Sequence, residues 1–167
     1  FPMVSGLMTS AADVISPDTI GKYSHPRQVR REGQYTWASE KAWCDDRGID
    51  YLPVIYPGYS RGSLAEEKKN LVPRRHGKLL WAQFQSAKNA GCEMAYIATF
   101  DGMHNGTAIF KFDQTAPQIE DINGIGFENI PSDYYLKLTG EGGMLLKNAI
   151  GSRPASAPKS VQYSSLP

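Results

Sequence analysis

IDYLPVIY, residues 49–56, is the stretch that decides the fold, because it joins β-branched, aromatic and aliphatic residues in a nearly continuous apolar run. Pro57 and Gly58 follow directly and end the run. An apolar run of this length is typical of a strand that is covered on both faces, as strands of parallel sheets are. The sequence therefore predicts a strand at residues 51–56.

Helices and further strands alternate on either side of this central run. After it, Leu80, Phe84 and Ala87 repeat at helical spacing until Gly91, and MAYIATF (94–100) is again apolar on both faces. Before it, the pattern predicts a helix at residues 36–47 and a basic loop at 23–34. Two short apolar runs predict strands at residues 3–7 and 12–16.

This alternation predicts an α/β fold in which a parallel sheet is built with right-handed crossovers. Ligands of such folds bind beyond the carboxyl ends of the strands. Functional residues are therefore expected in the segments just after Pro17, Tyr56 and Phe100.

The last third of the chain is less regular. Residues 107–112 fit a further strand or an extended loop, and Ser132-Asp133 is a suitable N-cap for a helix that reaches Leu138. Three glycines are expected to interrupt that helix: Gly140, Gly142 and Gly143. Residues 1–150 are predicted to form one domain, and residues 151–167 a flexible tail rich in Ser and Pro.

Composition excludes several classes of function. The 167 residues carry a formal net charge of +1 and no long apolar run, so neither nucleic acid nor a membrane is an expected partner. A local basic cluster is expected to be a solvated face rather than a phosphate-binding patch: Lys68, Lys69, Arg74, Arg75 and Lys78. Cys44 and Cys92 are expected to be buried thiols, and no metal or cofactor is predicted.

Gly58-Tyr59-Ser60-Arg61-Gly62 matches the G-x-S-x-G pattern of a nucleophile elbow and follows a strong strand. The elbow also requires a helix immediately after the serine, and Arg61-Gly62-Ser63 is a poor helix start. Asp101 and His104 are too close together to complete a triad. Ser60 is therefore predicted not to be a nucleophile.

Five blocks of sequence, in order, resemble the glycoside hydrolase family 71/99-like group. They are ADVISP with TIGKY (12–23), YLPVIYPGYS (51–60), GKLLWAQFQSAKNAG (77–91), MAYIATFD with GTAIFK (94–111) and PSDYYLKLTGEGG (131–143). The resemblance implies a (β/α)8 barrel that acts on α-linked glycans, with two glutamates three residues apart in the pattern Phe-Asp-Glu-x-x-Glu-Gly-Thr. This chain keeps Asp101, Gly106 and Thr107, but Gly102 and Asn105 stand at the two glutamate positions.

Neither Gly102 nor Asn105 can donate a proton to a leaving group or form a glycosyl intermediate, and glycoside hydrolysis ordinarily needs two carboxyl groups. The first hypothesis is therefore a domain that has lost catalysis and binds an α-linked glycan. Asp101 and His104 are its candidate residues for any remaining chemistry. Its candidate carbohydrate-binding residues are Asp18, Tyr56, Tyr59, Arg61, Asn105 and Phe100.

Two alternatives stay open. One is an active glycosidase in which Asp101 works with Asp45, with Asp113 or with a carboxylate of a partner chain. The other is a protein-interaction module that uses an exposed sheet edge. A further expectation is that so short a chain forms a half-barrel completed by a second copy or by an N-terminal half-barrel chain. Asn105-Gly106-Thr107 is also a glycosylation sequon, and with the resemblance it predicts secretion.

Overall fold

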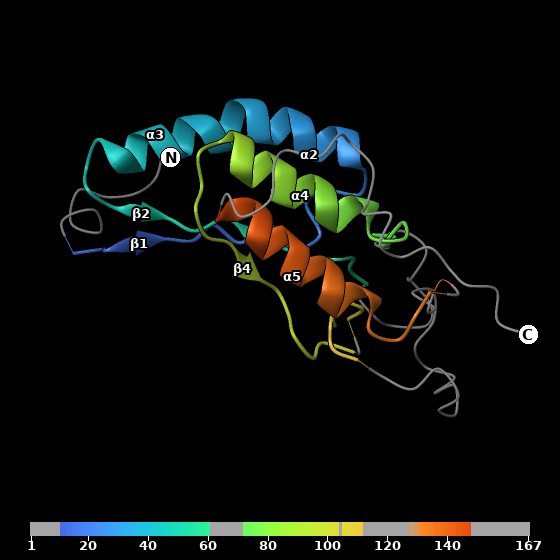
Figure 1. The fold of residues 1–167 in the computed structure, drawn as a ribbon. Helices are drawn as coiled ribbons and strands as arrows, with labels where there is room; N and C mark the ends of the chain where they lie inside the picture. Colours follow the sequence, from blue (N-terminus) through green and yellow to red (C-terminus); the bar gives the residue numbers. More distant parts are fainter. Residues whose placement is uncertain (1–10, 61–71, 104, 112–127, 129, 148–167) are drawn as a thin grey trace, which may run out of the picture.

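The computed structural model describes residues 11–60, 72–103, 105–111, 128 and 130–147. Within this part the chain is a mixed α/β structure with two small parallel pairs of strands (Figure 1). The strand predicted at residues 3–7 and the tail predicted at 151–167 lie outside the described residues, as do Arg61 and His104.

Among the described residues, four two-residue strands form the regular β structure. β1 (Val14–Ile15) pairs in parallel with β2 (Asp50–Tyr51), and β3 (Val54–Ile55) pairs in parallel with β4 (Tyr96–Ile97). The parallel strands predicted at 12–16, 51–56 and 94–100 are thus confirmed in place and direction, although each is shorter than predicted and the run at 51–56 is divided into two strands. Pro53 separates β2 from β3, because proline has no N–H group to donate to a neighbouring strand.

The segment that contains β2 and β3 lies between its two neighbours. The N–H groups of Asp50 and Leu52 donate to the carbonyls of Asp13 and Ile15, both at 2.9 Å. The carbonyls of Pro53 and Ile55 instead accept from Tyr96 and Ala98, at 3.0 and 2.9 Å. Even-numbered and odd-numbered residues of a strand direct their backbone groups to opposite edges, so β1 and β4 flank this segment on either side.

The predicted loop at residues 23–34 is wrong, because a helical stretch begins ten residues earlier than expected. It consists of α2 (Pro26–Glu32), a π-helical turn η1 (Gly33–Trp37) and α3 (Ala38–Asp45). Pro26 occupies the first turn, and His25 and Gln28 form a capping box. Val29, Gly33 and Trp37 give the helix a buried stripe.

Helix α4 (Lys78–Asn89) confirms the predicted helix and is the most buried element of the described chain. Helix α5 (Tyr134–Leu146) corrects a second prediction, since it runs without a break through all three glycines. α5 packs closely on α4 at Gly142. A Cβ at this position would lie under 3.0 Å from the Phe84 ring, so the close contact depends on glycine. Burial of Leu138, Leu145 and Leu146 outweighs the propensity cost of the glycines, about 1 kcal/mol each.

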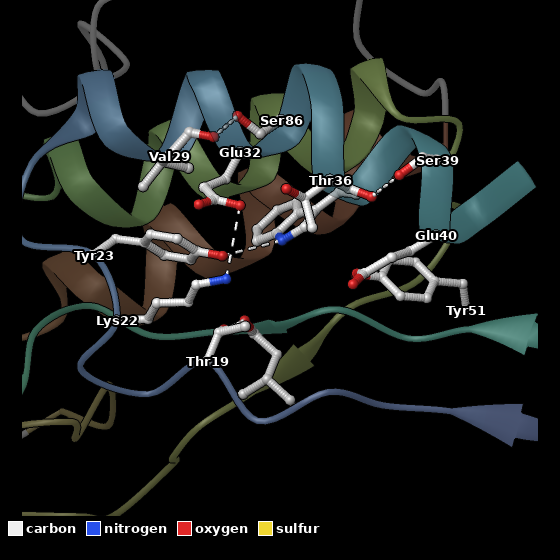
Figure 2. Close-up of polar contacts among 12 residues, drawn as sticks. Thr19, Lys22, Tyr23, Val29, Glu32, Thr36, Ser39, Glu40, Tyr51 and Ser86 are labelled. Carbon is white, nitrogen blue, oxygen red and sulfur yellow. Dashed lines mark hydrogen bonds and ion pairs between the residues drawn. The ribbon is translucent and has the colours of Figure 1, made fainter. Parts of the chain in front are cut away.

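The helices cover one face of the strands and run opposite to them, so helix N-termini and strand carboxyl ends meet at the same end of the molecule (Figure 1). Polar contacts join the layers beneath α2 and α3 (Figure 2). There the Trp37 indole donates to the Tyr23 hydroxyl at 3.3 Å, and the Tyr51 hydroxyl donates to Glu40 at 2.5 Å. Burial and the bond to Glu40 raise the pKa of Tyr51 well above its usual value.

Candidate functional site

Three loops meet at the carboxyl ends of the strands, where the sequence predicts functional residues. Thr19, after β1, donates its hydroxyl to the Val54 carbonyl at 2.6 Å. Tyr59, after β3, packs its ring against Gly21, where a Cβ would lie 2.9 Å from that ring. The N–H of Ser60 donates to the Asn105 carbonyl, after β4, at 2.9 Å. The fold therefore brings the three predicted segments together.

Gly102 lies at the centre of the loop after β4, within a small cluster of hydroxyl and amide groups. Its N–H donates to Thr99 Oγ1 at 3.0 Å, and Thr99 Oγ1 lies 2.9 Å from Thr107 Oγ1. Thr107 in turn donates its hydroxyl to Asn105 Oδ1 at 2.7 Å. A Cβ at residue 102 would lie under 3.0 Å from all three side chains. The loop thus leaves no room for a side chain at this position.

Arg74 supports this loop from below, and the sequence did not predict that role. Its side chain is buried, donates through Nε to the Gly106 carbonyl at 3.2 Å and through Nη2 to the Ala108 carbonyl. The guanidinium also lies 4.1 Å from the centre of the Tyr135 ring. Burial lowers the pKa of Arg74. The prediction of a solvated face is therefore wrong for Arg74.

The exposed part of the site holds the predicted residues that reach solvent. Asp18 and Asp101 are exposed, and Asp18 Oδ1 accepts the N–H of Ile20 at 2.9 Å. The Phe100 side chain is 60% exposed, and its ring centre lies 6.0 Å from that of Phe110. Tyr59 and Asn105 are half-buried. Aromatic and carboxylate groups of this kind match the hydroxyls and apolar faces of a sugar ring.

Tyr56 does not reach this surface. Its ring is fully buried, and its hydroxyl accepts the Tyr23 N–H at 2.8 Å and donates to the Tyr23 carbonyl at 3.0 Å. Burial raises the pKa of Tyr56 above its usual range. The amide of Gln83 in α4 pairs with the backbone of Tyr56, accepting its N–H at 3.2 Å and donating to its carbonyl at 2.7 Å. Tyr56 therefore fixes the loop after β1 rather than presenting a ring at the surface.

Of the carboxylates considered as partners for Asp101, Asp45 lies at the opposite end of the strands. It is the last residue of α3, which runs towards the start of β2, and it forms an ion pair with Lys41. Asp113 lies outside the described residues. Within the described ranges, no group of three or more His, Cys, Asp or Glu side chains is placed to hold a metal ion.

Ser60 is buried, with its N–H bonded to Asn105, and the residues after it are not described, so the prediction about the nucleophile elbow stays a prediction. Cys44 and Cys92 are buried free thiols, as predicted. None of the helices in the described residues has the length and apolar character needed to cross a membrane.

Comparisons with known proteins find a distant similarity to endo-alpha-mannosidases. No family model matches it. Over 76 residues it is 30% identical to a mouse glycoprotein endo-alpha-1,2-mannosidase-like protein. The matched residues make up 45% of this chain and 17% of the mouse protein. Two structures of the GH99 endo-alpha-mannosidase from Bacteroides thetaiotaomicron, one of them with bis-tris propane, match with TM-scores of 0.59 and 0.55, both at 21% identity.

The two structural matches cover 70% and 68% of this chain, but 34% and 35% of the bacterial chain. The chain therefore spans about a third of the solved relatives and about a sixth of the mouse protein. The fold and these matches define a glycoside-hydrolase-like α/β domain. It is a distant relative of the GH99 endo-α-mannosidases, and the resemblance predicted from the sequence is confirmed.

Proposed function

We propose that this chain forms half of a (β/α)8 barrel that binds an α-mannosyl glycan at the carboxyl ends of its strands without cleaving it. The observation that carries the proposal is the packing around Gly102. Where the resemblance implies a catalytic glutamate, three side chains occupy the space that a side chain would need. The rest of the loop cluster, including its exposed aromatic and acidic groups, remains available to a sugar.

The half-barrel is supported by the two faces of the strands. Tyr51 and Ile55 are buried under the helices, as the outward face of a barrel strand is. Val14 and its register partner Asp50 lie on the other face of the strands. There Val14 is 45% exposed and Tyr96 is 51% exposed. A barrel strand directs this second face into the packed interior. A second copy or a separate half-barrel chain would bury it.

The loss of catalysis follows from the two replaced glutamates. General acid catalysis alone contributes about 10²–10⁴-fold, and the nucleophile or base is missing as well. Wild-type protein is expected to release no reducing sugar from α-mannan, measured at high enzyme concentration. Turnover that disappears in Asp101→Asn would overturn this part of the proposal and support the alternative of an active glycosidase built on Asp101.

Restoring the carboxylates is not expected to restore activity. In the double variant Gly102→Glu with Asn105→Glu, the first substitution meets Thr99 and Thr107 at its Cβ, and the second removes the amide that accepts the Thr107 hydroxyl. The loop would thus have to rearrange, and it would not hold the two carboxyl groups in the fixed geometry that glycosidases use. The same reducing-sugar assay, run with a circular-dichroism check of folding, tests this expectation.

Sugar binding is attributed to Phe100 and Tyr59 as stacking surfaces and to Asp18 and Asp101 as hydrogen-bond acceptors. Saturation-transfer NMR with α-1,2-mannobiose measures it directly. Phe100→Ala is expected to weaken binding by about fivefold, since an aromatic contact contributes on the order of 1 kcal/mol. Tyr35→Ala is the matched control, because Tyr35 is 64% exposed but lies on η1, in the helical layer. Equal loss in both variants, or none in either, contradicts the proposed site.

A further inference from the structure

A cavity outside the loop cluster lies between the start of α2 and the segment that leads into α4. Its volume is about 540 Å³, within the range of small-molecule sites. The side chains that matter most in its wall are Arg27, Arg30, Arg75, Lys78, Trp81 and Glu128. Because α2 and α4 both begin at the carboxyl ends of the strands, the cavity opens at the same end of the molecule as the candidate sugar site.

The charge of this wall is strongly unbalanced. It carries four permanent cations and one carboxylate, in a protein whose formal net charge is only +1. Glu128 is already engaged, because its oxygens accept the His76 N–H at 3.0 Å and the Tyr135 hydroxyl at 2.6 Å. In the part of the chain that the structure describes, no ion pair involves Arg27, Arg30, Arg75 or Lys78. The cavity therefore favours an anion.

Two of the wall residues are fixed in place. Arg75 is half-buried and donates through Nε to the Ser24 carbonyl at 3.0 Å, which leaves its terminal nitrogens free of backbone contacts in the described residues. Trp81 is only 2% exposed, and its indole N–H is a buried donor that has no partner among the described residues. The indole nitrogen is itself enclosed by protein, so recognition of an anion in the cavity falls to the four cations and not to Trp81.

We propose that this cavity binds a small phosphate monoester. Guanidinium groups present paired N–H donors that match phosphate oxygens, and several cations around one space suit a dianion better than a single carboxylate. A nucleic acid is disfavoured, because the protein has no net positive field beyond this patch and polyanion binding depends on many phosphate contacts. The site is independent of the proposed glycan site, since it shares none of its residues.

Isothermal titration of the full chain at low salt tests the proposal, with inorganic phosphate and glucose 6-phosphate as probes and glucose as the uncharged control. Phosphate and glucose 6-phosphate are expected to bind and glucose is not. The double variant Arg30→Gln with Lys78→Gln is expected to weaken both by at least about tenfold, because it removes two charge-assisted contacts. Arg31→Gln is the matched control, since Arg31 is exposed on the same helix and does not line the cavity.

Trp81→Phe provides a second control, because it keeps the ring and removes only an N–H donor that is enclosed by protein. It is expected to leave both phosphate binding and the far-ultraviolet circular dichroism unchanged. The proposal is overturned if wild-type protein does not bind phosphate, if Arg31→Gln weakens binding as much as the double variant, or if only a duplex oligonucleotide binds. Each result is separable from the glycan proposal, because α-1,2-mannobiose is titrated in a separate experiment and glucose 6-phosphate contains no mannose.

Discussion

At the scale of single residues, Gly102 is the most constrained position of the candidate site. Three polar side chains enclose it, and its carbonyl accepts the N–H groups of Thr107 and Ala108 at 2.9 and 3.2 Å. An added methyl group cannot be placed without moving this cluster. The loop is therefore built around the absence of a side chain at residue 102.

Gly102→Ala is expected to destabilise the protein by roughly 1–3 kcal/mol, the usual cost of inserting a methyl group into a packed site. Urea unfolding followed by fluorescence measures the change. Gly140→Ala is the matched control, because Gly140 lies within α5 and its Cβ would meet nothing within 4 Å. There alanine is expected to stabilise by about 0.5–1 kcal/mol. Similar effects at both positions would show that residue 102 has more space than the structure indicates.

Buried ionisable groups predict a loss of stability at alkaline pH. Burial raises the pKa of the Cys92 thiol from 9.0 to about 11 and that of the Tyr23 hydroxyl from 10.0 to about 12. Both groups ionise more readily in the unfolded chain, so deprotonation favours unfolding. The stability that they confer is complete below about pH 9 and falls as the pH rises towards 12.

Urea titrations between pH 8 and pH 11, the range set by these two pKa values, measure this loss. In the double variant Cys44→Ala with Cys92→Ala the decline is expected to begin about one pH unit later, near the usual pKa of tyrosine, because burial raises the pKa of both thiols from 9.0. An unchanged onset would mean that these thiols are not protected from ionisation in the folded protein.

At the scale of secondary-structure elements, α4 holds the loops of the site in place through one side chain. Gln83 is fully buried, and its amide satisfies both the N–H and the carbonyl of Tyr56 while also donating to the Leu79 carbonyl at 3.1 Å. The amide replaces the pairing that a neighbouring strand would otherwise provide. The strand can therefore leave the sheet at Tyr56 and continue towards Tyr59.

Gln83→Leu is expected to destabilise the protein by about 2–4 kcal/mol, because it leaves two buried backbone groups of Tyr56 without partners. The measurement is the free energy of unfolding in urea. Gln34→Leu serves as the control, since Gln34 is exposed on η1 and its replacement should change stability by less than about 0.5 kcal/mol. A Gln83→Leu protein as stable as the control would show that water or other groups satisfy the Tyr56 backbone.

The sequence predicts the elements whose signal is local, and it misses those that depend on distant contacts. α4 is predicted because Leu80, Phe84 and Ala87 form a regular apolar face. The start of α2 is missed because residues 23–34 are polar and basic, which is typical of a loop, while the helix depends on the distant contact of Gly33 with Ser86. A Cβ at Gly33 would lie under 3.0 Å from the Ser86 side chain, and the sequence gives no sign of that pairing.

The same limit applies to the site. The loop after β4 is predicted because ligands bind beyond the carboxyl ends of parallel strands. Arg74 is missed because an arginine in a basic run is usually solvated, and its acceptors lie 32 and 34 residues away in the chain. Tyr56 and Phe100 have similar apolar surroundings in the sequence, yet one is fully buried and the other is 60% exposed.

At the scale of the whole molecule, the uncovered face of the strands predicts self-association. Three exposed apolar residues lie at or beside the strands: Val14, Tyr96 and Met94. In a closed barrel, residues on this face of the strands point into the packed interior. Native mass spectrometry at tens of micromolar protein is expected to show a dimer. Tyr96→Lys is expected to shift it towards monomer, because a charge would have to be buried in the new interface.

Tyr35→Lys is the control for this experiment, because Tyr35 is exposed on the helical side of the molecule. It should leave the distribution unchanged. A wild-type protein that stays monomeric, or a dimer that resists Tyr96→Lys but not Tyr35→Lys, would contradict association through the strands.

The bonds that join the three loops have a consequence for how such a site evolves. Ser60 is tied to Asn105 by peptide groups, and Phe100 accepts the N–H groups of Ile109 and Phe110 through its backbone carbonyl. Substitution exchanges side chains but leaves peptide groups in place. Substitutions in these loops are therefore expected to change the chemistry of the opening more readily than the path of the backbone that frames it.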